Sequence, residues 1–509
     1  MATIIQKTDT EIVVQVTIKI TGSMLEMENA IQNGVNEVGG IATGAALNKF
    51  DATGDPINIA GIKLTSKGKV AKEYQTPYGA AMVERYVYQS SNGGKTFCPL
   101  DDNARIIISS TPKFAQMISY KYAASSAIEV AGDLQKNHGR KTTPSFVQQT
   151  ADMVGSIAQA TEESWNYEIP KQDEPIATIS FSLDGTCMLM HKTDENDPAS
   201  RATNKQQLIQ DFGIKIKTNT KDETIFKIIR ESIGADGHVP DCISQKIIKK
   251  IKHGEIDTLS ALLDSMHIPE PGGYREAMTG NISLYNPDGH RMHTIYLGAT
   301  PEYGKAKFLS RLQNEINKTK EKYPDAVYVG IADGAASNWE FLHQNTQCQI
   351  LDFYHAAEYL AGASYAFHAS EAERKAWFHT ARHELRHTNN AAQTLLAQME
   401  DQSVKIEDKK RISDVTKKKL SAAITYFSNQ LSRMNYTAYT AKNLPIGSGV
   451  TEAACKTLIK QRLCLSGMRW KNRGASIVLA LRALVKTTDR WEQFWNKISS
   501  NGIIGVQTA

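Results

Sequence analysis

The sequence has no long apolar run and no closely paired cysteines, and these two absences exclude several classes of protein. No uninterrupted apolar stretch in the 509 residues approaches the roughly 20 residues that a membrane-spanning helix requires, so no membrane partner is expected. The six cysteines are scattered without a Cys-x-x-Cys pair, which indicates free thiols, mostly buried, and no zinc cage. The amino terminus lacks the charged-then-apolar pattern of a signal peptide, which favours the cytoplasm.

Excess charge is also scarce overall, but it is unevenly distributed. The net charge is only +5, whereas residues 441–490 contain ten Lys or Arg against two acidic residues. A concentrated basic segment suggests a polyanionic partner, with nucleic acid first in line. The alternative is an ordinary solvated helix face.

One short apolar stretch ends in an acid. Residues 327–332 predict a buried strand that Asp333 and Gly334 terminate, before a helical pattern around Trp339. Open α/β sheets place their chemistry at such strand ends. An ordinary Asp-Gly turn is the alternative, because this dipeptide is a common turn signal.

The elements around this strand predict a mixed sheet. Three strands are expected at 177–190, 275–285 and 290–298, the last two joined by a turn at 286–289, followed by a helix at 302–322. The strand ending at Asp333, a short helix and a strand at 348–352 complete the order β-β-β-α-β-α-β, which is typical of the RNase H-like fold. The fold class is therefore α/β, with several domains.

The expected domain organisation surrounds that core. A helix is expected at 23–34, with loops at 39–44. Two further helices, at 121–134 and 145–154, resemble a helix-turn-helix, with Thr142 or Thr143 as the cap of the second. An ordinary helical hairpin fits these two helices equally well. The expected domains are a β-rich accessory module (1–110), a helical DNA-binding region (111–170), the catalytic core (171–190 and 274–355), an inserted subdomain of unknown role (191–273), an all-α insertion (356–445), and a helix carrying Glu452 with a basic tail (446–509).

Three acids are candidates for one site. Asp184 interrupts the first strand, Asp333 ends the fourth, and Glu452 begins a helix. The first and fourth strands of an RNase H-like sheet are neighbours, and converging carboxylates repel each other strongly without a cation. Hard oxygen ligands suit two Mg²⁺ ions, with Mn²⁺ as a substitute, and phosphodiester chemistry. For Glu452 the alternative is the common preference for an acid at a helix amino terminus.

Several strings, in order, closely resemble the ISKra family of bacterial insertion-sequence transposases. They are Ser182-Leu-Asp-Gly-Thr, the segments 274–285, 296–305, 329–335 and 351–360, Ile446-Gly-Ser-Gly-Val-Thr-Glu, and Ser466-Gly-Met-Arg-Trp. The resemblance implies that Asp184, Asp333 and Glu452 form a DDE triad, and that an all-α insertion separates the last two. The segment 191–273 departs from the family pattern, which has a shorter link there.

Residues near the acids have less certain roles. Asp352 and His355 match an Asp-x-x-His motif of related transposases, but a structural role is the alternative for both. Trp339, Trp377 and Trp470 are candidates for stacking on unpaired bases, with core packing the more frequent role of tryptophan. The candidates for DNA contacts are Arg462, Arg469, Trp470, Lys471, Arg473 and Lys141.

The resulting hypothesis is a DDE-class DNA transposase. It would bind terminal inverted repeats of double-stranded DNA, act as a homodimer or higher oligomer in the nucleoid, and catalyse Mg²⁺-dependent strand cleavage and strand transfer. The alternatives are a domesticated DNA-binding protein with the same fold and a structure-specific RNase H-like nuclease.

Overall fold

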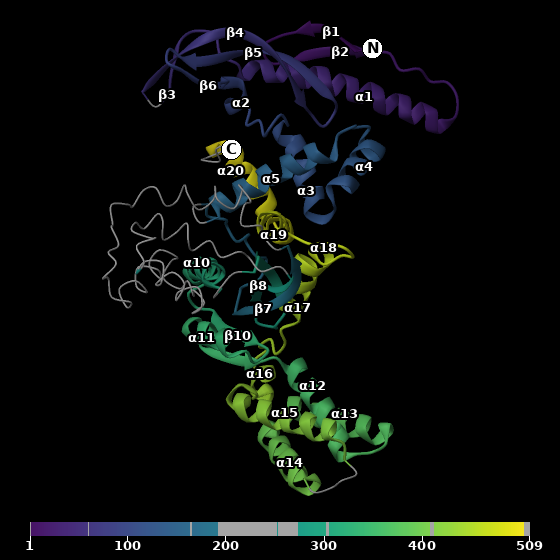
Figure 1. The fold of residues 1–509 in the computed structure, drawn as a ribbon, viewed down its shortest axis with the longest axis vertical. Coiled ribbons are helices and arrows are strands. Elements are labelled where there is room, and N and C mark those ends of the chain that lie inside the picture. Colours follow the sequence, from purple (N-terminus) through teal and green to yellow (C-terminus); the bar gives the residue numbers. More distant parts are fainter. Residues whose placement is uncertain are drawn as a thin grey trace. The chain divides into compact units, whose positions relative to one another are not determined.

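The computed structural model describes residues 2–59, 61–162, 165–191, 252, 273–301, 305–407 and 412–502. The chain forms two compact units, Met1–Glu168 with Ser476–Ala509 and Ile169–Ala475, and it is a mixed α/β protein with several sheets (Figure 1). The inserted subdomain expected at 191–273 lies almost entirely outside the described residues. Within the described ranges, every helix is too short or too polar to cross a lipid bilayer.

The first unit begins with two antiparallel sheets separated by a long helix. Strands β1 (Ala2–Lys7) and β2 (Ile12–Val16) form a pair, and β3 (Ile57–Ile59), β4 (Ile62–Gln75), β5 (Ala80–Ser90) and β6 (Gly93–Phe97) form a four-stranded sheet. Between them, α1 (Met24–Leu47) starts at a capping box made by Ser23 and Glu26. The loops expected at 39–44 are wrong, because α1 continues through those glycines to Leu47.

Helices complete the first unit: α2 (Pro99–Asn103), α3 (Pro112–Ala124), α4 (Ala127–His138), α5 (Pro144–Thr161), the second part of α19 (Asn472–Lys486) and α20 (Arg490–Asn501). The single helix expected at 121–134 is wrong, because Ser126 caps a new helix with Glu129 in a second capping box. The cap expected at Thr143 is confirmed, since its side chain accepts a hydrogen bond from Phe146 N.

The second unit is built on a five-stranded sheet. Strands β7 (Thr178–Met190), β8 (Gly273–Tyr285) and β9 (Arg291–Ala299) are antiparallel neighbours, and β10 (Val327–Ala332) and β11 (Cys348–Leu351) join β7 in parallel, in the order β11-β10-β7-β8-β9. The turn expected between β8 and β9 is confirmed by the bond from Gly289 N to Asn286 O at 3.0 Å. The strand expected to end at Asp333 is also confirmed.

The two faces of this sheet differ in chemistry. One face packs against α10 (Ala306–Lys322) and α11 (Ala336–Asn345), where Gly280 leaves room for Phe308 and Gly330 leaves room for Leu342. The opposite face is unusually polar for a buried surface, and its side chains on β7 and β8 are Ser180, Ser182, Asp184, Thr279, Asn281 and Ser283. Buried polar groups usually have hydrogen-bond partners. Here Ser283 contacts Asn281 and Thr294 within the sheet, and Thr279 and Asn281 contact Cys455 and Thr451 of a later segment.

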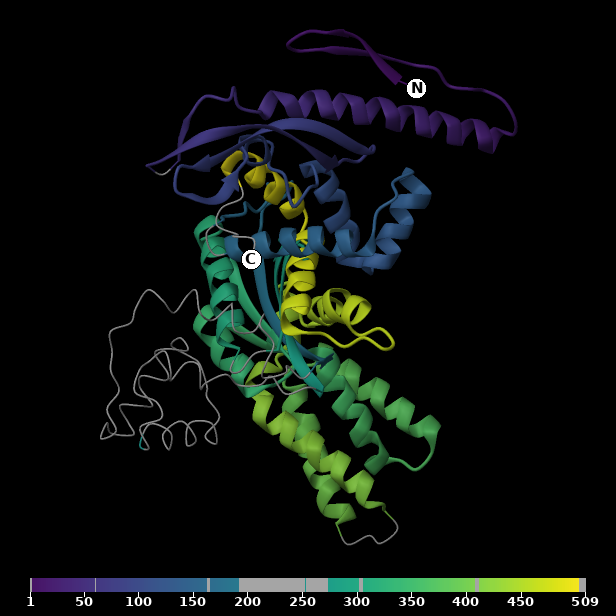
Figure 2. The ribbon, with the colours of Figure 1, turned by 45° about the horizontal axis from the view of Figure 1, so that its top comes forward.

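Helices follow the sheet and carry the chain from Asp333 to Glu452. They are α12 (Phe353–Phe367), α13 (Glu371–His387), α14 (Ala391–Ile406), α15 (Asp414–Gln430) and α16 (Tyr436–Ala441), which in Figure 2 lie, in green, beyond one end of the strands. Their apolar side chains share one core with the sheet, including Leu351, Leu395 and Phe427. The chain then returns through α17 (Gly449–Ala454), the π-helical turn η3 (Cys455–Lys460) and α18 (Gln461–Leu463).

The five cysteines in the described residues are free thiols, as expected. The expectation that most are buried is wrong, because Cys187 and Cys464 are exposed and only Cys455 is buried.

Candidate active site

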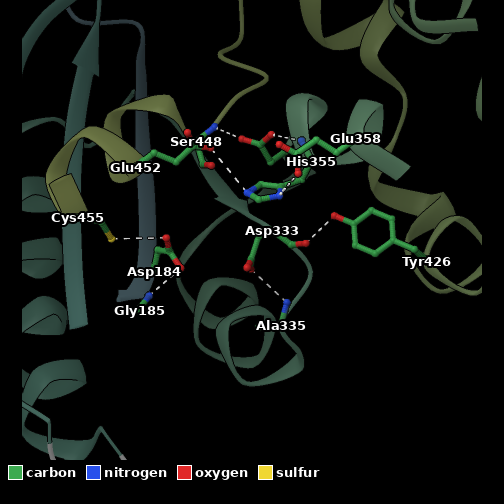
Figure 3. Close-up of polar contacts among 11 residues, drawn as sticks. Asp184, Gly185, Asp333, Ala335, His355, Glu358, Tyr426, Ser448, Glu452 and Cys455 are labelled. Carbon is green, nitrogen blue, oxygen red and sulfur yellow. Dashed lines mark hydrogen bonds and ion pairs between the residues drawn. The ribbon is translucent and has the colours of Figure 1, made fainter. Parts of the chain in front are cut away.

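Two aspartates lie level on neighbouring strands. The parallel pairing of β7 with β10 sets Ser182 opposite Ile331. Continued for two residues, this register sets Asp333 level with Asp184, and the alternation of side chains places both on the polar face. Figure 3 shows the two carboxyl groups facing the same space. Two acids from distant parts of the sequence therefore meet, as the order of strands predicted.

The Asp184 carboxylate is partly buried and has a protein partner on each oxygen. Its Oδ1 accepts a hydrogen bond from Gly185 N at 2.7 Å, and its Oδ2 accepts one from Cys455 Sγ at 3.5 Å. Burial raises the pKa of Asp184 above its ordinary value, and the negative charge of Asp333 raises it further. The charge of Asp333 is therefore close enough to act on the Asp184 carboxyl group.

Cys455 lies at the start of the π-helical turn, a distortion that is frequent at functional sites. Its Sγ lies 3.0 Å from Thr279 Oγ1. Burial raises the pKa of Cys455 to about 12, so the thiol keeps its proton at neutral pH and acts as a hydrogen-bond donor to Asp184. Cys455 is not among the residues predicted from the sequence, although its position three residues after Glu452 puts both on neighbouring parts of one helical surface.

The loop that carries Asp333 is held by α15. Tyr426 donates its hydroxyl hydrogen to Asp333 O at 2.5 Å, and Gln430 Nε2 donates to Gly334 O at 3.3 Å. Gly334 has a φ of +119°, a conformation that favours glycine, and a Cβ there would lie 3.0 Å from the Tyr426 ring. No sequence signal marks Tyr426, which is 93 residues from its partner.

Glu452 lies on α17, which packs against β7 and β8. Next to it, buried Thr451 accepts a hydrogen bond from Asn281 Nδ2 at 2.7 Å, which ties α17 to the polar face of the sheet. The Glu452 side chain is 53% exposed, and its Oε1 lies 3.7 Å from His355 Nε2. The other nitrogen of His355 lies 3.5 Å from Glu358 Oε2 (Figure 3). Glu452 is therefore the most exposed of the three acids, and its carboxylate lies close to a histidine side chain.

Asp352 has a defined structural role. Its side chain is fully buried, Oδ1 accepts a hydrogen bond from His355 N at 2.8 Å, and Oδ2 accepts one from Ser448 N. Phe353 N also donates to Ile446 O at 2.9 Å. Asp352 thus caps α12 and fastens the segment that leads to Glu452, so it positions an acid without facing the shared space.

The basic candidates separate into buried and exposed residues. Arg462 is only 2% exposed and its guanidinium lies 5.3 Å from the centre of the Trp470 ring, so its expected role as a phosphate contact is not favoured. Arg469, Lys471 and Arg473 are exposed. Trp470 is hydrogen-bonded through its backbone to Leu189 O at 3.1 Å, which places the exposed basic residues beside the end of β7.

The other candidates lie elsewhere. Lys141 is exposed but belongs to the first compact unit. Trp339 is buried beneath the Arg433 guanidinium, and Trp377 stacks on Phe367 at 4.5 Å. Both tryptophans pack within the protein, which is the alternative that the sequence left open for them.

No group of three His, Cys, Asp or Glu side chains in the described ranges is arranged to hold a metal ion, and Asp184 and Glu452 instead contact protein partners. No model of a known protein family matches the chain, and no curated protein matches it.

Proposed function

We propose that this chain is a DDE-class DNA transposase with an RNase H-like core. The strand order β11-β10-β7-β8-β9, with three antiparallel and two parallel strands, supports the core assignment. The observation that carries the proposal is the level placement of Asp184 on β7 and Asp333 directly after β10, with Glu452 on α17, which packs against β7 and β8. These three acids are the set that the ISKra resemblance implies.

The chemistry of the donor groups fits Mg²⁺. All three acids offer hard oxygen ligands, which suit Mg²⁺. The raised pKa of Asp184 reflects, besides burial, repulsion by Asp333, which a cation between them would relieve. Asp184, Asp333 and Glu452 would hold Mg²⁺, or Mn²⁺ in its place, and the metal would supply activation of an attacking oxygen and stabilisation of a leaving oxygen in phosphodiester chemistry.

The residues of the chain itself have separable tasks. Asp184 and Asp333 provide a rigid pair because the sheet register sets their separation, while Glu452 closes the site from the helix side. His355 Nε2 faces Glu452 Oε1 and orients that carboxylate. Gly185 N and Cys455 Sγ each contact one oxygen of Asp184 and fix the orientation of this carboxylate.

The DNA partner is proposed from charge. Arg469, Lys471 and Arg473 are exposed in the same unit as the acids and offer contacts to phosphates. On this proposal the protein binds double-stranded transposon ends and target DNA in the nucleoid, as a homodimer or higher oligomer, so that two ends are processed together.

The test is cleavage and joining of labelled transposon ends by the purified chain with Mg²⁺. Asp333→Asn is expected to abolish both reactions and to keep DNA binding. Asp325→Asn is the matched control, because Asp325 is exposed just before the other end of β10 and is expected to leave activity unchanged. Full strand transfer by Asp333→Asn would refute the proposal.

Other outcomes separate the alternatives. Cleavage of branched DNA or RNA–DNA hybrids without joining identifies a nuclease, and DNA binding with no cleavage identifies a domesticated binding protein. A readout that does not need activity is thermal unfolding with and without Mn²⁺. Stabilisation of the wild-type chain that is lost in Asp333→Asn is expected, and equal stabilisation of both proteins contradicts the ligand assignment.

A further inference from the structure

An open cavity lies beside the Asp333 loop, on the side away from Asp184. Its volume is about 480 Å³, and it is lined by Gly334, by Tyr359 of α12, and by residues of α15 that include Lys418, Thr425 and Asn429. Tyr426 also lines it and bonds to Asp333 O. The cavity therefore adjoins the candidate active site without including any of the three acids.

The chemistry of the cavity suits an anion with hydrogen-bonding edges. No acidic residue is among those that line it, and Lys418, Thr425 and Asn429 recur at helical spacing along one side of α15. Within the described part of the chain, the side chains of Lys418 and Asn429 have no partner of their own. An ammonium group binds phosphate, and an amide can donate to and accept from the edge of a base.

Two aromatic rings border the same space. Tyr359 and Tyr426 are stacked with their centres 3.9 Å apart and their planes at 14°. The hydroxyl of Tyr426 is engaged with Asp333 O, so its ring is held in place. Rigid aromatic surfaces next to a cation are the features by which proteins bind unpaired nucleotides.

We propose that this cavity binds one unpaired nucleotide of the DNA strand next to the scissile phosphate, with Lys418 at a phosphate and Asn429 at the base. The inference rests on the proposed function, because it takes Asp333 to be part of a catalytic site. The volume is within the range of about 300–1,000 Å³ that is usual for sites of small ligands. A base inside a duplex is stacked and paired, so only an unpaired one can enter.

The test compares forked DNA, with a single-stranded thymidine arm containing 4-thiothymidine, and blunt duplex DNA. Ala422→Phe fills the cavity from an exposed lining position and is expected to lower affinity for the fork about tenfold while leaving duplex affinity unchanged. Lys418→Ala is expected to lower fork affinity several-fold and to reduce the slope of log affinity against log salt by about 0.7. Lys419→Ala is the control, because Lys419 lies over the Tyr365 ring outside the cavity.

Photocrosslinks from 4-thiothymidine are expected on peptides containing Tyr359 or Tyr426, in Asp333→Asn as in the wild type. Fork affinity in folded Ala422→Phe and Lys418→Ala equal to that of the wild type overturns the inference, as do crosslinks confined to other peptides. The two proposals fail distinguishably: strand cleavage without cavity crosslinks refutes only the cavity. Cavity crosslinks without any cleavage refute the catalytic function, and with it the position beside a scissile phosphate, but keep nucleotide binding.

Discussion

Two strands and one helix hold the acids of the candidate site by different means. Asp184 lies within β7, and Asp333 follows directly after β10, which pairs with β7 in parallel, so the backbone of the sheet sets the level of both. The loop of Asp333 has in addition the contacts of Tyr426 and Gln430. Glu452 depends on side chains that are distant in sequence: Asn281 holds Thr451 beside it, and Asp352 holds Ser448 before it. Glu452 should therefore respond more strongly than the two strand acids to substitutions far from itself.

The largest expected effect is at the strand pair. Asp184→Asn should reduce strand cleavage about 10³-fold or more, because a ligand of the proposed metal site is lost. The neighbouring Cys455→Ser retains a hydroxyl donor and is the milder comparison at the same carboxylate. Activity in Asp184→Asn within tenfold of the wild type would show that register alone does not make this acid catalytic.

The Asp184→Asn variant also has an expected effect on stability. Burial and the charge of Asp333 raise the pKa of Asp184 in the folded protein above its value in the unfolded chain. The ionised carboxylate therefore destabilises the folded protein at pH values above the folded pKa. This destabilisation is absent below the unfolded pKa, where the group is protonated in both states. Without metal, Asp184→Asn should therefore raise Tm at pH 7, because the buried charge and its repulsion by Asp333 are removed. The gain should shrink as the pH falls toward 4, measured by thermal unfolding; a gain independent of pH would contradict this origin.

The next effect is expected at Asp352, which touches no substrate in the proposed function. Asp352→Ala leaves His355 N and Ser448 N without their acceptor, and should destabilise the protein by about 1–3 kcal/mol and lower cleavage about 10–100-fold. Ser370→Ala, which removes the cap of α13, is the matched control and should cost stability of about 1 kcal/mol with activity kept. Equal activity in Asp352→Ala and Ser370→Ala would show that the position of Glu452 does not depend on Asp352.

The smallest effect is expected at Tyr426. Tyr426→Phe removes the hydrogen bond to Asp333 O but keeps the ring stacked on Tyr359, so cleavage should fall about 3–10-fold and stability by about 1 kcal/mol. If Tyr426 positions Asp333, the variant should need a higher Mn²⁺ concentration for half-maximal activity. A loss of stability alone should leave that concentration unchanged. Tyr365→Phe, on exposed Tyr365, should change neither quantity.

Prediction from sequence succeeded where the signal was local. The strand before Asp333, the turn at 286–289 and the cap at Thr143 each depend on a few adjacent residues, and all are confirmed. The failures were also local in origin: the serine pair at 125–126 was read as helix interior, and the glycines at 39–44 as loops. Glycine disfavours a helix by only about 1 kcal/mol, so the rest of α1 outweighs it.

By itself the sequence determined which acids are available and the order of the strands that carry two of them, because apolar periodicity and strand-ending residues are written in adjacent positions. Only the tertiary structure decided what surrounds those acids. Tyr426 contacts Asp333, and Cys455 contacts Asp184, across long distances in sequence. The burial of Arg462 depends on how the surrounding segments pack. Such contacts depend on how helices pack against the sheet, and no pattern within a short segment encodes that packing.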